Sequence, residues 1–201
     1  MAANSDTDEC LLDRLRLGDE QAFVALVQRY RPSMLRIAAC YVPGRAVAEE
    51  VVQDTWLGVL RGLSGFEGRS SVRTWLFRIL VNRARTTGAR ERRSVPLGED
   101  LAPAVDQSRF DAAGNWAVPP AHWHDQVDDR LVAERMASRI RTAIMDLPAR
   151  QREVVTLRDL EGLGSVEVCG VLDISEANQR VLLHRGRSRL RQVLETEFGR
   201  A

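Results

Sequence analysis

The C-terminal part of the chain contains two segments with helical apolar spacing, separated by a tight Asp-Ile-Ser turn. Ile174 is placed to fill this turn, and Ser175 is placed to cap the helix that follows. The apolar side chains that we expect to face inward on the two helices are Val166, Val168, Val171, Leu172, Val181, Leu182 and Leu190. Two short amphipathic helices joined in this way predict a helix-turn-helix within residues 147–191.

The second of these helices begins with side chains that can read base edges. Asn and Gln pair bidentately with adenine, Arg pairs with guanine, and this part of a helix-turn-helix enters the major groove. Arginines farther along the helix, Arg191 included, suit phosphate groups. The candidate DNA-contacting residues are Ser175, Glu176, Asn178, Gln179, Arg180, His184, Arg185, Arg187 and Arg189. A packing unit without DNA is the alternative, but Asn178, Gln179 and Arg180 have no obvious role in a core.

Charge is unevenly distributed along a chain that is close to neutral overall. The 201 residues are 44% hydrophobic and 28% charged, with a formal net charge of +1. This is enough apolar material for one or two small domains with cores. Residues 61–93 are rich in arginine, whereas residues 94–130 are predominantly acidic. The first stretch therefore predicts an anion-binding surface, and the second repels anions.

Cysteine usage and the N-terminus point to a reduced, cytoplasmic protein. The cysteines lie far apart without CxxC pairing, and the N-terminus has no apolar signal core. No apolar run is long enough to cross a bilayer, so we expect no membrane insertion. His122 and His124 have no further ligand cluster, and no nucleophile-base pair or phosphate-binding glycine loop is evident. We therefore expect no metal, no cofactor and no catalysis.

The N-terminal part of the chain reads as a group of helices. Helical apolar spacing is present in residues 11–17, 21–42, 45–63 and 74–93. We expect Pro32 to kink or restart the second helix, and the Gly- and Ser-rich residues 64–73 to form a loop. The candidate inward positions of the third helix are Val47, Val51, Leu57, Leu60 and Leu63, and its other side carries Glu49, Glu50, Gln53 and Asp54.

Between residue 94 and about residue 129 the helical pattern dissolves into prolines, glycines and acids. Phe110, Trp116 and Trp123 lie inside this stretch, and such aromatics indicate a surface on which it docks. The expected fold is therefore all-α, with two small helical domains, residues 1–93 and 131–201. A flexible acidic linker, residues 94–130, joins them.

Motifs in both halves resemble those of extracytoplasmic-function (ECF) sigma factors of bacterial RNA polymerase. In the N-terminal half they are AEEVVQDTWL from Ala48, GFEGRSS from Gly65, and TWLFRI with NRA from Thr74. In the C-terminal half they are LPARQREVV from Leu147 and LLHRGRSRLR from Leu182. These matches cover most of the chain in the order found in the family, and they combine the second and fourth conserved sigma regions.

The resemblance implies a factor that binds core RNA polymerase, directs it to a promoter and melts the −10 element without catalysing a reaction. It implies contacts with the clamp helices of the largest subunit and with the flap of the second-largest subunit. It assigns core polymerase binding to Glu49, Glu50, Gln53, Asp54 and Leu57. Exposed carboxylates opposite an arginine-rich clamp would give orientation, with apolar neighbours supplying affinity.

The resemblance assigns the −10 element to the loop and helix that follow. Opened DNA needs a pocket, an aromatic wall and cations along the strand. The residues implied are Phe66, Gly68, Arg69, Ser70, Ser71, Arg73, Trp75, Arg78, Asn82, Arg83 and Arg85. The start of the last helix is implied to read the −35 element. An anti-sigma factor is the further partner implied, and the acidic linker would run near the polymerase cleft.

Other interpretations of the same residues stay open at this point. Trp56 and Trp75 fit packing more often than base stacking, and the carboxylates of residues 45–63 alone would read as a solvated helix side. The turn carries Asp173 where the family has glycine, and Asp tolerates a left-handed conformation. Because EANQRV from Glu176 also departs from the family, no −35 sequence is carried over. The rival functions are an autonomous helix-turn-helix regulator and a protein acting mainly through a partner.

Overall fold

The computed structural model describes residues 7–91 and 130–198, and in these ranges the chain is helical without any strand. The all-α fold class is therefore confirmed. The described helices fall into two compact units, one built from α1 to α4 with α7 and the other from α5, α6 and α8. The predicted acidic linker, with His122, His124 and the linker aromatics, lies outside the described residues.

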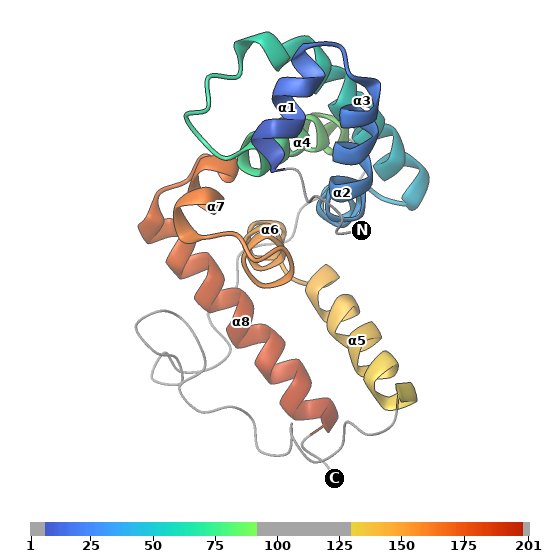
Figure 1. The fold of residues 1–201 in the computed structure, drawn as a ribbon. Helices are drawn as coiled ribbons and strands as arrows, with labels where there is room; N and C mark the ends of the chain where they lie inside the picture. Colours follow the sequence, from blue (N-terminus) through green and yellow to red (C-terminus); the bar gives the residue numbers. More distant parts are fainter. Residues whose placement is uncertain (1–6, 92–129, 199–201) are drawn as a thin grey trace. The chain divides into compact units, whose positions relative to one another are not determined.

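The first four helices pack around one apolar core (Figure 1). Their bounds are Asp8–Arg16 for α1, Glu20–Ala39 for α2, Arg45–Gly62 for α3 and Val72–Glu91 for α4, with a short 3-10 turn at Leu63–Gly65. The core is formed by side chains from all four helices, among them Leu12, Leu26, Met34, Val59, Phe77 and Leu80, each at most 1% exposed. The four helical segments expected in this half are therefore present.

Pro32 lies inside α2 and does not restart the helix, which was one of the two effects predicted for it. α2 runs through Pro32 without a break in the helical assignment. A proline removes the hydrogen bond to the carbonyl four residues earlier, here that of Gln28. Pro32 and Gln28 are both exposed, so this carbonyl lies on the side of the helix where water can replace the lost donor.

The inward face of α3 differs from the predicted one. Leu57 and Leu60 are 50% and 42% exposed, whereas the buried side is formed by Ala48, Val51, Val52, Thr55, Trp56 and Val59. Trp56 packs edge to face on Phe23, with ring centroids 5.5 Å apart. Since α3 carries apolar residues on more than one side, packing of the large indole ring decides which side turns inward. Trp56 is accordingly a core residue.

The second unit combines α5, α6 and α8, which Figure 1 shows in yellow, orange and red. Their bounds are Arg130–Met145, Ala149–Val155 and Glu176–Phe198, and α6 continues into a π-helical segment at Thr156–Leu160. α6 and α8 approach closely at Gly186, where an added Cβ would lie 2.6 Å from Cγ2 of Val155. Glycine at this position therefore permits the close packing of the two helices.

The predicted turn before α8 is present, and α7, Ser165–Leu172, precedes it. Asp173 adopts the expected left-handed conformation with φ 57°. Ser175 caps α8, since its Oγ accepts a hydrogen bond from the Asn178 amide at 3.2 Å. Val168, Val171 and Leu172 are buried as predicted.

The prediction that Val166 and Val181 face inward is wrong. Val166 is 73% exposed and Val181 is 47% exposed. Both were grouped with true core residues by apolar character alone, and neither shares the buried side of its helix.

No helix in the described part of the chain is long and apolar enough to cross a membrane.

Candidate polymerase and promoter interface

The exposed side of α3 carries four of the five residues predicted to bind core polymerase. Glu50 and Gln53 are exposed, and Asp54 and Leu57 lie beside them with side chains 57% and 50% exposed. Glu49 differs, because it is half-buried and forms ion pairs with Arg45 at 3.0 Å and Arg31 at 3.6 Å. The exposed side of α3 therefore presents Leu57 within a polar, acidic surface.

Arg83 of α4 lies against α3. Its Nη1 is 3.8 Å from Oδ2 of Asp54. A Cβ added at Gly58 would lie 2.9 Å from Nη2 of Arg83, so the missing side chain leaves room for the guanidinium. The Arg83 guanidinium thus lies between α4 and α3, and its predicted contact with the DNA strand stays a prediction.

The loop before α4 is organised by an aromatic pair. Phe66 and Trp75 lie with ring centroids 4.7 Å apart at an interplanar angle of 38°. The Phe66 carbonyl accepts a hydrogen bond from Arg16, which ties the loop to the end of α1. Arg69 at the tip is 83% exposed and pairs with Glu67 at 2.6 Å. Both aromatic rings are only half-buried, so part of this pair faces solvent.

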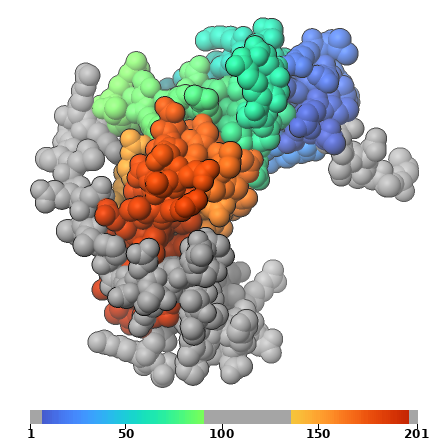
Figure 2. Space-filling model, turned by 90° about the vertical axis from the view of Figure 1, so that its left-hand side faces the viewer, coloured from blue at the N-terminus to red at the C-terminus, as the bar shows by residue number. Residues whose placement is uncertain are grey.

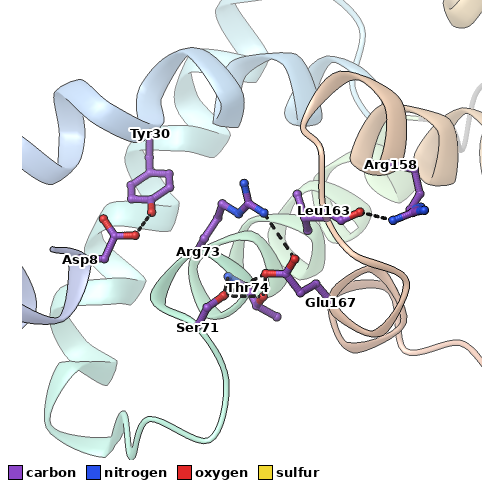
Figure 3. A network of polar contacts seen from close by, with 8 residues as sticks. All are labelled: Asp8, Tyr30, Ser71, Arg73, Thr74, Arg158, Leu163 and Glu167. Atoms are coloured by element: carbon purple, nitrogen blue, oxygen red, sulfur yellow. Dashed lines mark hydrogen bonds and ion pairs between the residues drawn. The ribbon is translucent and has the colours of Figure 1, made fainter.

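The start of α4 is a polar cluster that holds a carboxylate (Figure 3). Ser71 caps the helix, with its Oγ accepting from the Thr74 amide at 3.2 Å. The Glu167 carboxylate of α7, within the same unit, accepts hydrogen bonds from the Ser71 and Thr74 hydroxyls at 3.2 and 3.1 Å. Arg73 adds an ion pair to Glu167 at 3.4 Å. Two hydroxyls, a guanidinium and a helix N-terminus together favour an anion.

Farther along α4, the predicted strand-contacting residues divide into two groups. Arg78 and Asn82 are exposed, and with the half-buried Trp75 they share one side of the helix at helical spacing. Arg85 is half-buried and donates to the Leu172 carbonyl at 3.3 Å. The structure therefore brings Trp75, Arg78 and Asn82 together, and it engages Arg85 with the end of α7.

The exposed start of α8 presents most of the predicted base readers. Glu176, Asn178 and Arg180 are exposed, and Arg180 pairs with Glu176 at 3.2 Å. His184 and Arg185 are half-buried one turn farther along. Figure 2 shows the end of α7 and the start of α8 at the surface on the face turned toward the viewer.

Gln179 does not belong to this surface. It is 2% exposed, and its Oε1 accepts a hydrogen bond from Ser165 Oγ at 3.0 Å. Its side chain therefore cannot reach a base edge without leaving the interior, which contradicts the prediction that it reads DNA. Sequence reasoning took the amide as a base reader because of its residue type, and only burial shows that it packs against the start of α7.

The later arginines of α8 are engaged within the second unit. Arg187 binds Asp159 with two contacts, at 2.6 and 3.0 Å, and its side chain is 11% exposed. Arg189 donates to Oε1 of Gln151 at 3.0 Å, and Arg191 pairs with Glu195 at 2.6 Å. These contacts engage the three guanidinium groups within the second unit, which argues against phosphate binding as their main role.

Two residues at this interface were not found from the sequence. Glu167 was not singled out because a lone carboxylate on a short helix gives no signal of its distant partners. Val181 was assigned to the core, so its exposure beside the base readers was not anticipated. Among the residues that the structure describes, no group of three or more His, Cys, Asp or Glu side chains could hold a metal ion.

Two family models match the chain in the order of its two halves. Sigma-70 region 2 matches residues 26–94, and Sigma-70 region 4 matches residues 137–190. The helices and surfaces described above thus belong to a two-region protein of the sigma-70 class.

Relatives and solved structures narrow this class. The chain is 30% identical to the ECF RNA polymerase sigma-E factors of Escherichia coli K12 and Salmonella typhimurium LT2, over 90% of this chain and 91% of each relative. It is 28% identical to that of Haemophilus influenzae over 94% and 96%. The chain belongs to the ECF sigma factors.

Two solved structures share the fold of this chain. CnrH in complex with the cytosolic domain of CnrY matches with a TM-score of 0.64 and 22% identity, covering 96% of this chain and 99% of that one. RpoE of Bartonella quintana in complex with the anti-sigma factor NepR matches with a TM-score of 0.60 and 20% identity, covering 87% and 98%. At these identities the likeness concerns the fold.

Proposed function

We propose that this ECF sigma factor binds core RNA polymerase through the exposed side of α3 and reads promoter DNA through the start of α4 and the start of α8. As a sigma factor it directs promoter-specific initiation and opens the −10 DNA. The observation that carries this proposal is the half-exposed Phe66–Trp75 pair, which lies beside the start of α4 with its Ser71 cap and Arg73. A regulator that binds only duplex DNA has no need for such a surface.

The α3 surface suits a basic helical partner such as the clamp of the largest polymerase subunit. Gln53, Asp54 and Leu57 are exposed together. An apolar centre with a charged rim favours affinity from the leucine and orientation from the carboxylate. Glu50 belongs to the same rim, whereas Glu49 acts mainly through its ion pairs with Arg45 and Arg31.

The −10 contacts follow from the chemistry at the start of α4. The Phe66–Trp75 pair offers a partly exposed aromatic surface on which an unstacked base can rest. Arg69, Ser70 and Gly68 border it as exposed residues of the loop. The Ser71, Arg73 and Thr74 cluster already holds a carboxylate, and the same donors suit a phosphate of the DNA strand. Arg78 and Asn82 continue this surface along α4.

The −35 contacts are assigned to the first turns of α8. Asn178 and Arg180 are exposed, and their amide and guanidinium groups are of the types that make bidentate base contacts. His184 and Arg185 lie one turn farther along, where phosphate contacts are common. Gln179 is excluded from this set by its burial.

Regulation by an anti-sigma factor is part of the proposal. One solved structure of the same fold is an RpoE in complex with the anti-sigma factor NepR. An inhibitor that covers the α3 surface would compete directly with polymerase. We infer that the protein acts in the cytoplasm, where RNA polymerase is found, and that it works by binding without catalysing a reaction.

Reconstituted transcription tests the proposal. Purified core polymerase and this chain are incubated with promoter fragments from the same genome, and the transcripts are sequenced from their 5′ ends. We expect initiation downstream of a shared pair of −35 and −10 motifs. If the folded chain binds specific duplex sites but supports no initiation, the autonomous regulator is the correct function.

A double variant tests the α3 surface separately. Gln53→Ala with Asp54→Ala should weaken core polymerase binding while leaving the helical circular dichroism unchanged, since both side chains are exposed. Gln28→Ala, an exposed position on α2, is the matched control. Equal polymerase affinity of the double variant and the control would remove α3 from the interface.

A further inference from the structure

The start of α8, which the proposed function assigns to DNA reading, carries an exposed apolar strip. Val181 is 47% exposed, and Ala177, one turn earlier, is also exposed. They are flanked by Asn178 and Arg180, which are exposed as well. Side chains at i and i+4 lie above one another on a helix, so Ala177 and Val181 form one continuous apolar surface between two polar side chains.

The packing of α8 explains why Val181 faces outward. The buried side of this part of the helix is formed by Gln179, Leu182, Leu183 and Gly186, and the Ser165 hydrogen bond holds Gln179 in place. With 3.6 residues per turn, Val181 then lies on the opposite side. A single exposed valine has no meaning in general. This one lies in the middle of the residues that the proposed function assigns to base reading.

Thymine is the base that presents an apolar group in the major groove. Its C5-methyl contacts small apolar side chains, whereas adenine, guanine and cytosine present polar atoms at their edges. Arg185, one turn beyond Val181, supplies positive charge that favours DNA over an apolar peptide as the occupant, whereas the charge of Arg180 is paired with Glu176 at 3.2 Å.

We propose that Val181, supported by Ala177, contacts a thymine methyl group in the −35 element and makes thymine preferred at that position. This inference rests on the proposed reading of the −35 element by α8. It adds a specificity-determining residue and the chemical group that it recognises. Asn178 and Arg180 read the neighbouring bases on either side.

The test uses holoenzyme and a promoter found by reconstituted transcription. Each thymine of the −35 element is replaced in turn by deoxyuridine, which lacks only the methyl group, and binding and initiation are measured. At one position the wild-type chain should lose affinity about fourfold, the factor that corresponds to the roughly 0.8 kcal/mol gained by burying one CH2-sized group. With Val181→Ala the same replacement should cost little, because the contact is already absent.

Val193→Ala is the matched control, because Val193 is an exposed valine near the other end of the same helix, 38% exposed. It should keep the full response to deoxyuridine. Thermal unfolding of both variants checks that the fold is retained, as expected for alanine at exposed helical positions.

Three outcomes would overturn the inference. A deoxyuridine effect of equal size in wild type and Val181→Ala means that another residue contacts the methyl. The absence of any deoxyuridine effect means that no methyl is read. If Val181→Ala binds core polymerase more weakly whichever DNA template is present, the valine belongs to a protein interface. Failure of the proposed function is distinct, because the wild-type holoenzyme would then initiate on no promoter.

Discussion

At the scale of single residues, burial separates neighbours that have similar chemistry. Asn178 and Gln179 both carry an amide that can pair with adenine, yet Asn178 is exposed and Gln179 is 2% exposed. A helix turns by about 100° per residue, so adjacent residues in α8 face different surroundings. The role of an amide here depends on its position around the helix, and the residue type alone does not determine it.

We predict that Gln179→Ala destabilises the protein without altering promoter choice. Removal of the buried amide leaves the Ser165 hydroxyl without this acceptor, and the free energy of unfolding should fall by about 1–3 kcal/mol. Denaturant unfolding measures this change, and transcription from −35 variants measures selectivity. Asn178→Ala is the control with the opposite pattern, since it should cost about 1–3 kcal/mol for the preferred base. If Gln179→Ala instead changes the base preference at the −35 element, Gln179 contacts a DNA base.

At the scale of helices, close approaches depend on residues without side chains. Gly88 of α4 is buried, and a Cβ there would lie 2.4 Å from the Tyr41 carbonyl oxygen, a backbone atom that cannot rotate away. The C-terminal half of α4, which follows the proposed strand-contacting residues, is therefore held against the segment between α2 and α3.

Gly88→Ala should destabilise the first unit by about 1–3 kcal/mol through overpacking, despite the higher helix propensity of alanine. Thermal or denaturant unfolding of the full chain measures the loss. Gly62→Ala is the control, because an added Cβ there meets only the Trp75 ring at an ordinary 3.6 Å. Equal stability of the two variants would show that the contact at Tyr41 relaxes without cost.

The corner between α1 and α2 should respond to acid. Asp19 caps α2 through the Gln21 and Ala22 amides. The hydrogen bond from Arg14 is the largest cause that lowers the pKa of this carboxyl below its usual value. Since the pKa is lower in the folded state, the stabilisation is complete above the unfolded pKa of about 3.9 and is lost as the pH falls through the folded value.

Asp19→Asn tests this dependence, because asparagine keeps the cap and removes the charge. The wild-type chain should be more stable than the variant above about pH 4, and the difference should shrink as the solution becomes more acidic. Equilibrium denaturation across this range measures it. A difference that stays constant with pH would indicate that the charge of Asp19 does not contribute.

At the scale of the whole molecule, each of the two units carries one of the surfaces that we propose to contact DNA. Both surfaces contain arginine, but the arginines differ in availability, and α8 shows this within three residues. Arg185 is half-buried near the proposed base readers, whereas Arg187 is held by Asp159. We therefore expect the salt dependence of promoter binding to reflect only a subset of the positive charges in the chain.

We predict that Arg185→Ala reduces the salt dependence of holoenzyme binding to promoter DNA, with the slope of log K against log salt falling by about 1. Arg187→Ala should leave this slope unchanged and lower the stability of the second unit, because it breaks the pair with Asp159. Binding titrations at several salt concentrations measure both slopes. Equal reductions in the two variants would place Arg187 on the DNA as well.

Much of the element structure could be predicted from local patterns. The helices of both halves, the Ser175 cap and the left-handed Asp173 depend on spacing, capping chemistry and turn preference, and all are present. The candidate site was harder, because the inward side of a helix depends on its neighbours. The apolar character of Leu60 and Val181 predicts burial, yet both face outward.

The amino-acid sequence was sufficient for the all-α class, the sigma family and the order of the two regions, since these depend on periodicity and motifs that lie close together along the chain. Packing decided which members of each motif face solvent. Three contacts join segments that are distant in sequence or lie on different helices. They are the ion pair of Glu167 with Arg73, the hydrogen bond of the buried Gln179 with Ser165, and the ion pair of Arg187 with Asp159. Local spacing carries no information about such contacts, because they form only when helices meet.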